Sequence, residues 1–170
     1  MAYSVTSRRK RENVDAKNSA VREVVVKHTF NARRETVFKA WTDPKYVALW
    51  WGPHGFTNPV CELDVREGGS IRIHMQGPEG TVYPMTGVYR EIVKPERLVF
   101  TSTPLNDKGE PIFEILQTVT FVEDGGKTIV TVDSRVIKAT ADADVYLQGM
   151  EEGWSQSLER LAEIVKEPLA

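Results

Sequence analysis

The order of hydrophobic and polar residues divides the chain into a polar start, a mixed segment, a strand-rich middle and a helical end. Residues 21–30 (VREVVVKHTF) are rich in β-branched side chains, which is typical of a strand. Apolar residues at helical spacing then predict two short helices, over 31–43 and 44–51. Proline at the first position of the second helix supports the break, because its ring fits a first turn. The glycines and proline of GPHG end this helix.

The middle of the chain predicts six further strands joined by turns. In SIRIHMQ the apolar Ile71, Ile73 and Met75 alternate with polar residues, which is the period of two that a half-buried strand shows. Turns that contain glycine or proline separate the other segments, and DGGK is a strong hairpin signal. Together with 21–30 this gives about seven strands, six of them in uninterrupted antiparallel sequence.

The chain ends in one long predicted helix, from about Asp142 to Lys166. Its apolar residues recur every three or four positions and form a single stripe: Leu147, Met150, Trp154, Leu158, Leu161 and Val165. Gly149 and Gly153 interrupt this helix, and each costs about 1 kcal/mol relative to alanine. That cost favours a close approach of the helix backbone to a strand or to a ligand.

These elements predict an α+β fold in which a strongly curved antiparallel sheet of about seven strands wraps around the C-terminal helix. The sheet must cover its inner face, and the amphipathic helix is the only large element that can do so. The two short helices after the first strand can close one end. Space left between a bent sheet and a helix is a common place for a small apolar ligand.

Four segments carry a resemblance to a known family: VFKAWTDPKYVALWWGPHGFT, LDVREGGSIRIHMQGPEGTVYPMTGVYREIVKPERLVFT, TVTFVEDGGKTIVTV and EGWSQSLERLAEIV. In their order and content they resemble the START-like (SRPBCC) superfamily, whose shape is the helix-grip fold. Within it the chain is similar to the homologues of the heat-shock-protein-90 ATPase activator, in their stand-alone bacterial form. The resemblance implies one START-like domain over 21–166, followed by a short C-terminal end over 167–170.

Composition and charge limit which class of protein this can be and which partners it can bind. The chain has 170 residues, of which 41% are hydrophobic and 27% charged, and a formal net charge of −2. Residues 1–20 are basic and are expected to form a poorly ordered tail, while the mildly acidic remainder argues against a nucleic-acid partner. No apolar run approaches the ~20 residues of a membrane span. The single cysteine, Cys61, is compatible with a reducing cytoplasm, where we expect the protein.

Candidate chemistry is sparse. His28 and His74 have no Cys, Asp or Glu at ligand spacing, so neither a metal site nor a cofactor is expected. Cys61 lies in an apolar strand, as a small core residue would. In IFEILQTVTF, apolar residues fall on both faces, so either Glu114 or Gln117 can point inward. A buried carboxylate there could act as a general acid or base, but the pattern favours a polar residue on the exposed sheet face.

Side-chain type therefore defines the candidate site, and no catalytic residue is assigned. Large aromatic side chains and adaptable methionines suit a cavity wall. The ALWWGPHGF segment is interpreted as a lid over the cavity mouth, with its histidine as a polar contact at the rim. The expected ligand-binding residues are Trp41, Trp50, Trp51, His54, Phe56, Ile71, Ile73, Met75, Met85, Tyr89, Phe100, Met150 and Trp154.

The function expected from these residues is the binding of a small hydrophobic or amphipathic molecule by a monomer or homodimer. Two alternatives stay open at this point. The resemblance implies a stress-related co-chaperone that binds heat-shock protein 90, and some relatives in the wider superfamily imply a cavity enzyme such as a cyclase. An enzyme would need convergent polar groups inside the pocket, and the sequence does not reveal them.

Overall fold

The computed structural model describes residues 5–7, 23–139 and 147–169. In chain order its elements are β1 (Val5–Ser7), β2 (Glu23–Phe30), α2 (Arg34–Thr42), α3 (Pro44–Trp50), β3 (Thr57–Leu63), β4 (Ser70–Gln76), β5 (Val82–Val93), β6 (Arg97–Pro104), β7 (Phe113–Asp124), β8 (Lys127–Ala139) and α5 (Met150–Ile164). The strands form one antiparallel sheet with the order β1-β2-β8-β7-β6-β5-β4-β3. The predicted α+β class and the order of its main elements are confirmed.

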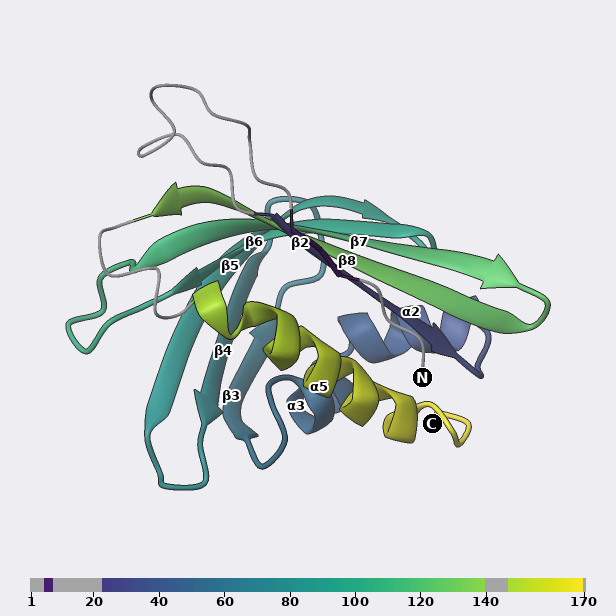
Figure 1. Ribbon diagram of the computed structural model, residues 1–170, viewed down its shortest axis with the longest axis horizontal. Coiled ribbons are helices and arrows are strands. Elements are labelled where there is room, and N and C mark those ends of the chain that lie inside the picture. Colours follow the sequence, from purple (N-terminus) through teal and green to yellow (C-terminus); the bar gives the residue numbers. More distant parts are fainter. Residues whose placement is uncertain (1–4, 8–22, 140–146, 170) are drawn as a thin grey trace.

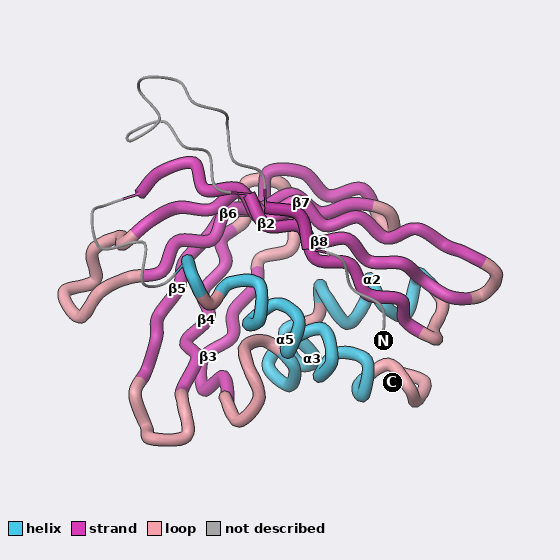
Figure 2. Tube along the Cα trace, in the orientation of Figure 1, coloured by secondary structure: helices cyan, strands magenta, loops and turns pink. Residues whose placement is uncertain are grey.

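The sheet curves around α5, as the helix-grip shape requires (Figure 1). Strands β3, β4 and β5 run steeply away from the direction of β7 and β8, and all the helices lie on the concave side (Figure 2). A register shift in the β5–β6 pair, between Tyr89 and Glu91, interrupts the ladder where the sheet bends. At Gly87, a Cβ atom would stand 2.0 Å from the carbonyl oxygen of Thr101, so only glycine permits this strand approach.

Two predicted boundaries lie next to residues that the structure does not describe. Val5–Ser7 of the expected tail form a short edge strand beside β2, and the other residues of 1–20 lie outside the described residues. The last helix is expected from Asp142, but 140–146 also lie outside the described residues. Residues 147–148 are helical, a turn follows at Gly149, and α5 then runs over Met150–Ile164. Gly149 lies at the N-cap position of α5 and makes no side-chain cap hydrogen bond.

The expected close approach of the last helix to a strand is wrong at both glycines. A Cβ atom added at Gly149 or Gly153 would meet no heavy atom of the described residues within 4 Å. The backbone therefore has open space on that side near the start of α5. In the parts of the chain that the structure describes, no helix is long and apolar enough to cross a membrane.

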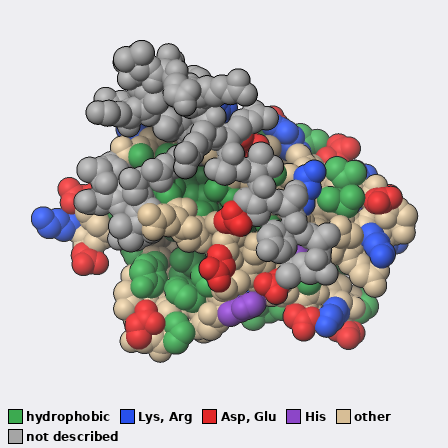
Figure 3. Space-filling view, in the orientation of Figure 1, with side chains coloured by type: hydrophobic (Ala, Val, Ile, Leu, Met, Phe, Trp, Pro, Cys, Tyr) green, Lys and Arg blue, Asp and Glu red, His purple; other side chains and the backbone are tan. Residues whose placement is uncertain are grey.

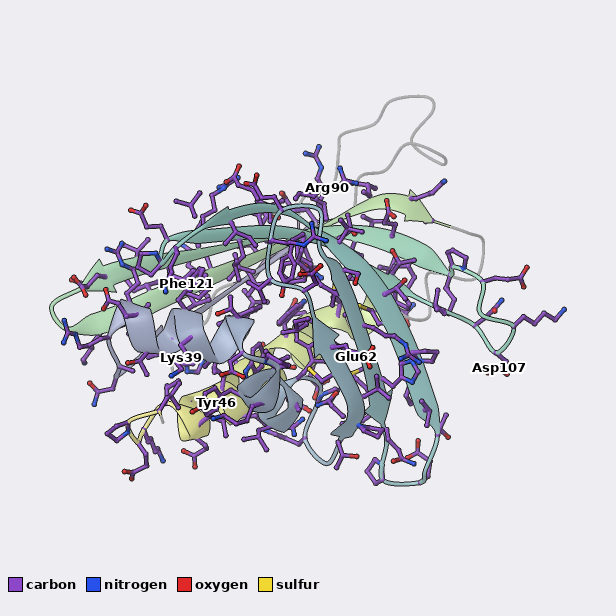
Figure 4. All side chains as sticks on the ribbon, turned by 180° about the vertical axis from the view of Figure 1, so that it is seen from behind. Lys39, Tyr46, Glu62, Arg90, Asp107 and Phe121 are labelled. Atoms are coloured by element: carbon purple, nitrogen blue, oxygen red, sulfur yellow. The ribbon has the colours of Figure 1, made fainter. Side chains whose placement is uncertain are left out.

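The main core lies between the concave face of the sheet and the helices. Phe121 on β7 is labelled in Figure 4, where it lies between the sheet and α2. Its ring meets that of Phe38 on α2 edge-on, with the centroids 5.2 Å apart. Leu158 and Leu161 of α5 are fully buried, so the predicted stripe of the helix does face the core. Each such side chain contributes about 1.5–3 kcal/mol of burial free energy.

Candidate functional site

Four tryptophans, from α2, from α5 and from the end of α3 and the residue after it, meet beneath the sheet. Trp41 of α2 stacks on Trp154 of α5, with ring centroids 5.7 Å apart and an interplanar angle of 20°. Trp50 meets Trp41 at 4.7 Å, and Trp51 meets Trp154 edge-on at 5.3 Å. The break at Pro44 brings α2 and α3 together, so residues ten apart in sequence share one cluster. The structure thus brings these four predicted site residues together.

A small void lies between the tryptophans and the sheet. Its volume is about 10 Å³, which is about the room that one water molecule needs. Six of the predicted residues line it, together with three apolar neighbours: Trp41, Trp51, Ile71, Ile73, Tyr89 and Phe100, with Val47, Leu63 and Leu98. Side chains thus fill nearly all of this space, and a larger occupant needs some of them to move.

The other predicted site residues lie around this void rather than on it. Trp50, Met85 and Trp154 are buried in the core, and Met150 is half-buried at the start of α5. Phe56 and Met75 are half-buried, and the Phe56 ring lies 5.9 Å from that of Tyr83.

The polar atoms near the void are uncharged. Burial raises the pKa of the Tyr89 hydroxyl far above its ordinary value, and the nearby Cys61 thiol and Asp64 carboxylate raise it further. Burial, with a smaller contribution from Glu62, raises the pKa of the Cys61 thiol to about 11. Both groups therefore stay protonated at neutral pH, and Cys61 is a poor nucleophile, as its apolar strand predicted.

One buried donor of the tryptophan cluster has no acceptor among the described residues. Trp41 is 3% exposed, and its indole Nε1–H makes no hydrogen bond. Trp50 differs, because its Nε1–H donates to the carbonyl oxygen of Ala40 at 2.9 Å. A buried donor without a partner costs about 1–3 kcal/mol, so Trp41 stands out among the rings of the cluster.

The segment after α3 is fastened to α5 by a residue that the sequence analysis did not single out. The Arg160 guanidinium donates to five backbone carbonyl oxygens, at 2.9–3.2 Å: those of Leu49, Trp51, Gly52, Pro53 and Phe56. The Leu49 carbonyl belongs to the last turn of α3, where a helix leaves its last carbonyls without partners and favours a cation. In the sequence, the signal for Arg160 was its place next to Leu161, beside the apolar stripe of α5.

Two more side chains of α5 hold the same segment. The backbone N–H of Gly52 donates to Ser157 Oγ, and that of His54 donates to Gln156 Oε1, both at 3.1 Å. The His54 side chain is exposed, and Gly52 takes a φ of 97°, which glycine adopts most readily. The segment is thus a fixed wall beside the tryptophans, and this geometry does not favour the lid interpretation.

A row of polar side chains crosses the concave face of the sheet beside the void. Gln117 on β7 donates from Nε2 to Ser102 Oγ on β6 at 3.1 Å and accepts from the hydroxyl of Ser134 on β8. All three are at most 6% exposed. Gln117 therefore takes the inward position, whereas Glu114 lies on the other face and accepts a long 3.5 Å hydrogen bond from Thr103. The alternation in VFTSTPL was the signal for Ser102, since it shares a face with Phe100.

His28 lies in a part of the structure away from the tryptophan cluster. His28 on β2 is buried beside Phe30, with ring centroids 4.5 Å apart, and burial lowers its pKa. It borders an open groove of about 580 Å³ between the end of β2 and the last turns of α5, outside the predicted site. Across residues 23–139 and 147–169, no group of three His, Cys, Asp or Glu side chains comes together in a way that could hold a metal ion.

Comparison with known proteins identifies the family of this chain. Residues 31–166 match the family described as Activator of Hsp90 ATPase homolog 1-like protein. The chain belongs to this family. The match spans both short helices, strands β3–β8 and α5, so it includes every residue of the tryptophan cluster. No curated protein is similar enough in sequence to match the chain.

Solved structures of bacterial proteins share the fold. A protein from Chromobacterium violaceum is 28% identical, with a TM-score of 0.71, over 85% of this chain and 97% of the other. A protein from Arthrobacter aurescens is 24% identical, with a TM-score of 0.77, over 97% and 92% of the two chains. A protein from Nitrosomonas europaea is 23% identical, with a TM-score of 0.73, over 85% and 94%. The last two likenesses establish the fold alone.

Proposed function

We propose that this family member binds a small hydrophobic or amphipathic molecule between the concave sheet and α5. The ligand would lie against Trp41, Trp51, Tyr89 and Phe100, where the small void lies. The observation that carries the proposal is the unpartnered indole N–H of Trp41, because a ligand oxygen beside it would restore the missing hydrogen bond.

Room for the ligand would come from movable side chains. Trp51 and Met150 are only half-buried, and Met150 has an unbranched chain that adapts to different shapes. An added Cβ atom at Gly149 or Gly153 would meet open space, so the start of α5 is not packed tightly from every side. Binding would thus enlarge the void, with the burial of about 25 cal/mol per Å² of apolar ligand surface as its driving force.

Native mass spectrometry of the full chain purified from its own host tests this proposal. We expect a population heavier than the polypeptide by the mass of one small molecule, which denaturing conditions remove. Titration with 2-ethylnaphthalene provides a second readout, since a ligand beside Trp41 and Trp51 would change the tryptophan emission. Only the polypeptide mass, together with unchanged emission, would contradict the proposal.

A chaperone partner, which the family name suggests, is the second candidate. Several large apolar side chains are exposed, among them Val82, Val88 and Val122, and could contribute to a protein contact. Stimulation of the ATPase of the host's heat-shock protein 90 by the purified chain would support this role. No stimulation and no co-purification of the chaperone would argue against it.

A further inference from the structure

We infer that Ser102, Gln117 and Ser134 form the polar end of the ligand site and select an uncharged ligand that carries a hydrogen-bond acceptor, such as a ketone or an amide. This inference rests on the proposed function and specifies the ligand class. It concerns residues on the strands, whereas the void beneath the tryptophans is almost wholly apolar.

The sheet register places this polar row between two apolar clusters. Gln117 pairs with Phe100 of β6 on one side and with Ser134 of β8 on the other. Toward the tryptophans, the next inward positions on these strands are Phe100, Val119 and Val132, which belong to the main core. In the opposite direction come Ile115 and Val136, which pack with Leu147 and Met150 in a smaller cluster.

The row lies close enough to the void for one small molecule to reach both. Phe100 lines the void and is the direct cross-strand neighbour of Gln117, and such neighbours have Cβ atoms about 4.5–5.5 Å apart. Met150 packs against both apolar clusters, so its movement would connect the two. A ligand with a ring beside Trp41 and a polar group at the row fits this arrangement.

Counting the hydrogen bonds in the row leaves donors available. The Ser134 hydroxyl donates to Gln117 Oε1, and one Gln117 Nε2–H donates to Ser102 Oγ. The second Nε2–H of Gln117 and the hydroxyl hydrogen of Ser102 take no part in either bond. Both are donors, so the complementary ligand atom is an acceptor. Because buried donors are costly when unused, an acceptor gains more here than an apolar group of equal size.

The charges around the polar row disfavour a ligand whose acceptor is an anion. Among the described residues, the buried polar side chains include no lysine, arginine, aspartate or glutamate. A carboxylate at the row would therefore be desolvated without a counter-charge, which is strongly unfavourable. The first turn of α5 carries Glu151 and Glu152, and acidic side chains lie along the part of the surface that this helix occupies (Figure 3). These charges would repel an anion that approaches beside the helix.

Three naphthalenes of similar size test the inference: 2-acetylnaphthalene, 2-ethylnaphthalene and 2-naphthoate. For the wild-type chain we expect the ketone to bind about tenfold more tightly than the hydrocarbon, and the carboxylate at least tenfold more weakly than the ketone. Isothermal titration calorimetry and tryptophan emission measure the three affinities. Equal or stronger binding of the hydrocarbon, or of the carboxylate, would overturn the inference and leave the proposed function standing.

Two variants and a spectroscopic readout separate recognition from a structural role. Gln117→Met and Ser102→Ala should each reduce the preference for the ketone over the hydrocarbon to less than threefold. In the wild type, the side-chain amide resonances of Gln117 should shift on addition of the ketone and stay unchanged with the hydrocarbon. An unchanged preference in folded variants would refute the polar row as the selecting element. No binding of any of the three compounds would overturn the proposed function and the inference together.

Discussion

Two regions beside α5 use their polar groups in opposite ways. At the segment after α3, Arg160 brings a cation into a half-buried position, and five carbonyl oxygens surround it. Burial lowers the pKa of this guanidinium, but arginine stays charged at any physiological pH. Beneath the sheet, Trp41 and the polar row are buried more deeply. The indole N–H of Trp41 has no acceptor among the described residues, and the row has donor hydrogens beyond its two hydrogen bonds.

This difference separates a structural contact from a candidate binding surface. Hydrogen bonds that are all made within the protein fix a segment and leave little for a ligand to gain. Buried donors without acceptors are tolerated only at a free-energy cost, and functional sites are where such costs are commonly found. The glycine- and proline-containing segment after α3 is the part that hydrogen bonds hold in place. The hydrogen-bond donors available to a ligand lie on the strands beside it.

The largest expected effect concerns the fixed segment. Arg160→Ala removes five hydrogen bonds to carbonyl oxygens, and we expect the free energy of unfolding to fall by about 2–4 kcal/mol, as measured by urea denaturation. Arg160→Lys should recover less than half of the loss, because an ammonium group lacks the planar fork. Arg66→Ala is the control, since its ion pair with Asp64 is exposed and is worth less than about 1 kcal/mol. Equal losses in both alanine variants would remove the contrast between the two regions.

The second prediction compares a tryptophan whose N–H has an acceptor with one whose N–H has none. Trp50→Phe leaves the Ala40 carbonyl without its donor, whereas Trp41→Phe removes a donor that has no acceptor. Both changes shrink a ring in the same cluster, so packing losses are similar. We expect Trp50→Phe to cost about 1–2 kcal/mol more in unfolding free energy than Trp41→Phe. If both variants lose the same stability, the indole N–H of Trp41 is not an unused donor.

The smallest expected effect is a pH dependence from His28. Its pKa in the folded protein lies below the ordinary value near 6.5, so the unfolded chain binds a proton more readily. Stability should therefore be unaffected by this group above about pH 6.5 and should decrease as the pH falls below it. His28→Asn should remove that part of the decrease, and His54→Asn, at an exposed position, should not. Urea denaturation between pH 5 and 8 measures the difference, and identical profiles for the wild type and His28→Asn would contradict this assignment.

Much of the fold could be predicted because its signals are local. Alternation along SIRIHMQ and the stripe from Leu147 to Val165 follow directly from the periods of a strand and a helix. Element boundaries were less certain. Gly149 allows a helix to continue or to end, and only the surrounding packing decides between the two. Three residues of the basic tail pair with β2, which no periodicity in so short a segment could predict.

The candidate site was predicted in part. Six of the expected residues line the void, because large apolar residues on inward positions meet wherever the sheet closes on the helix. His54, by contrast, is exposed, since its segment is turned by the bonds of its backbone to α5 rather than by its own side chain. Whether these residues bind a ligand stays a prediction.

The sequence by itself determined the elements, their amphipathic faces and the family, because each depends on residue type at fixed spacing. Only the tertiary structure decided that four tryptophans nearly fill the space beneath the sheet, that Arg160 collects five carbonyl oxygens, and that Gln117 rather than Glu114 turns inward. Those outcomes depend on distances between residues far apart in the chain. Hydrogen-bond partners and packing volumes arise only when the sheet curves around α5, so no local pattern could contain them.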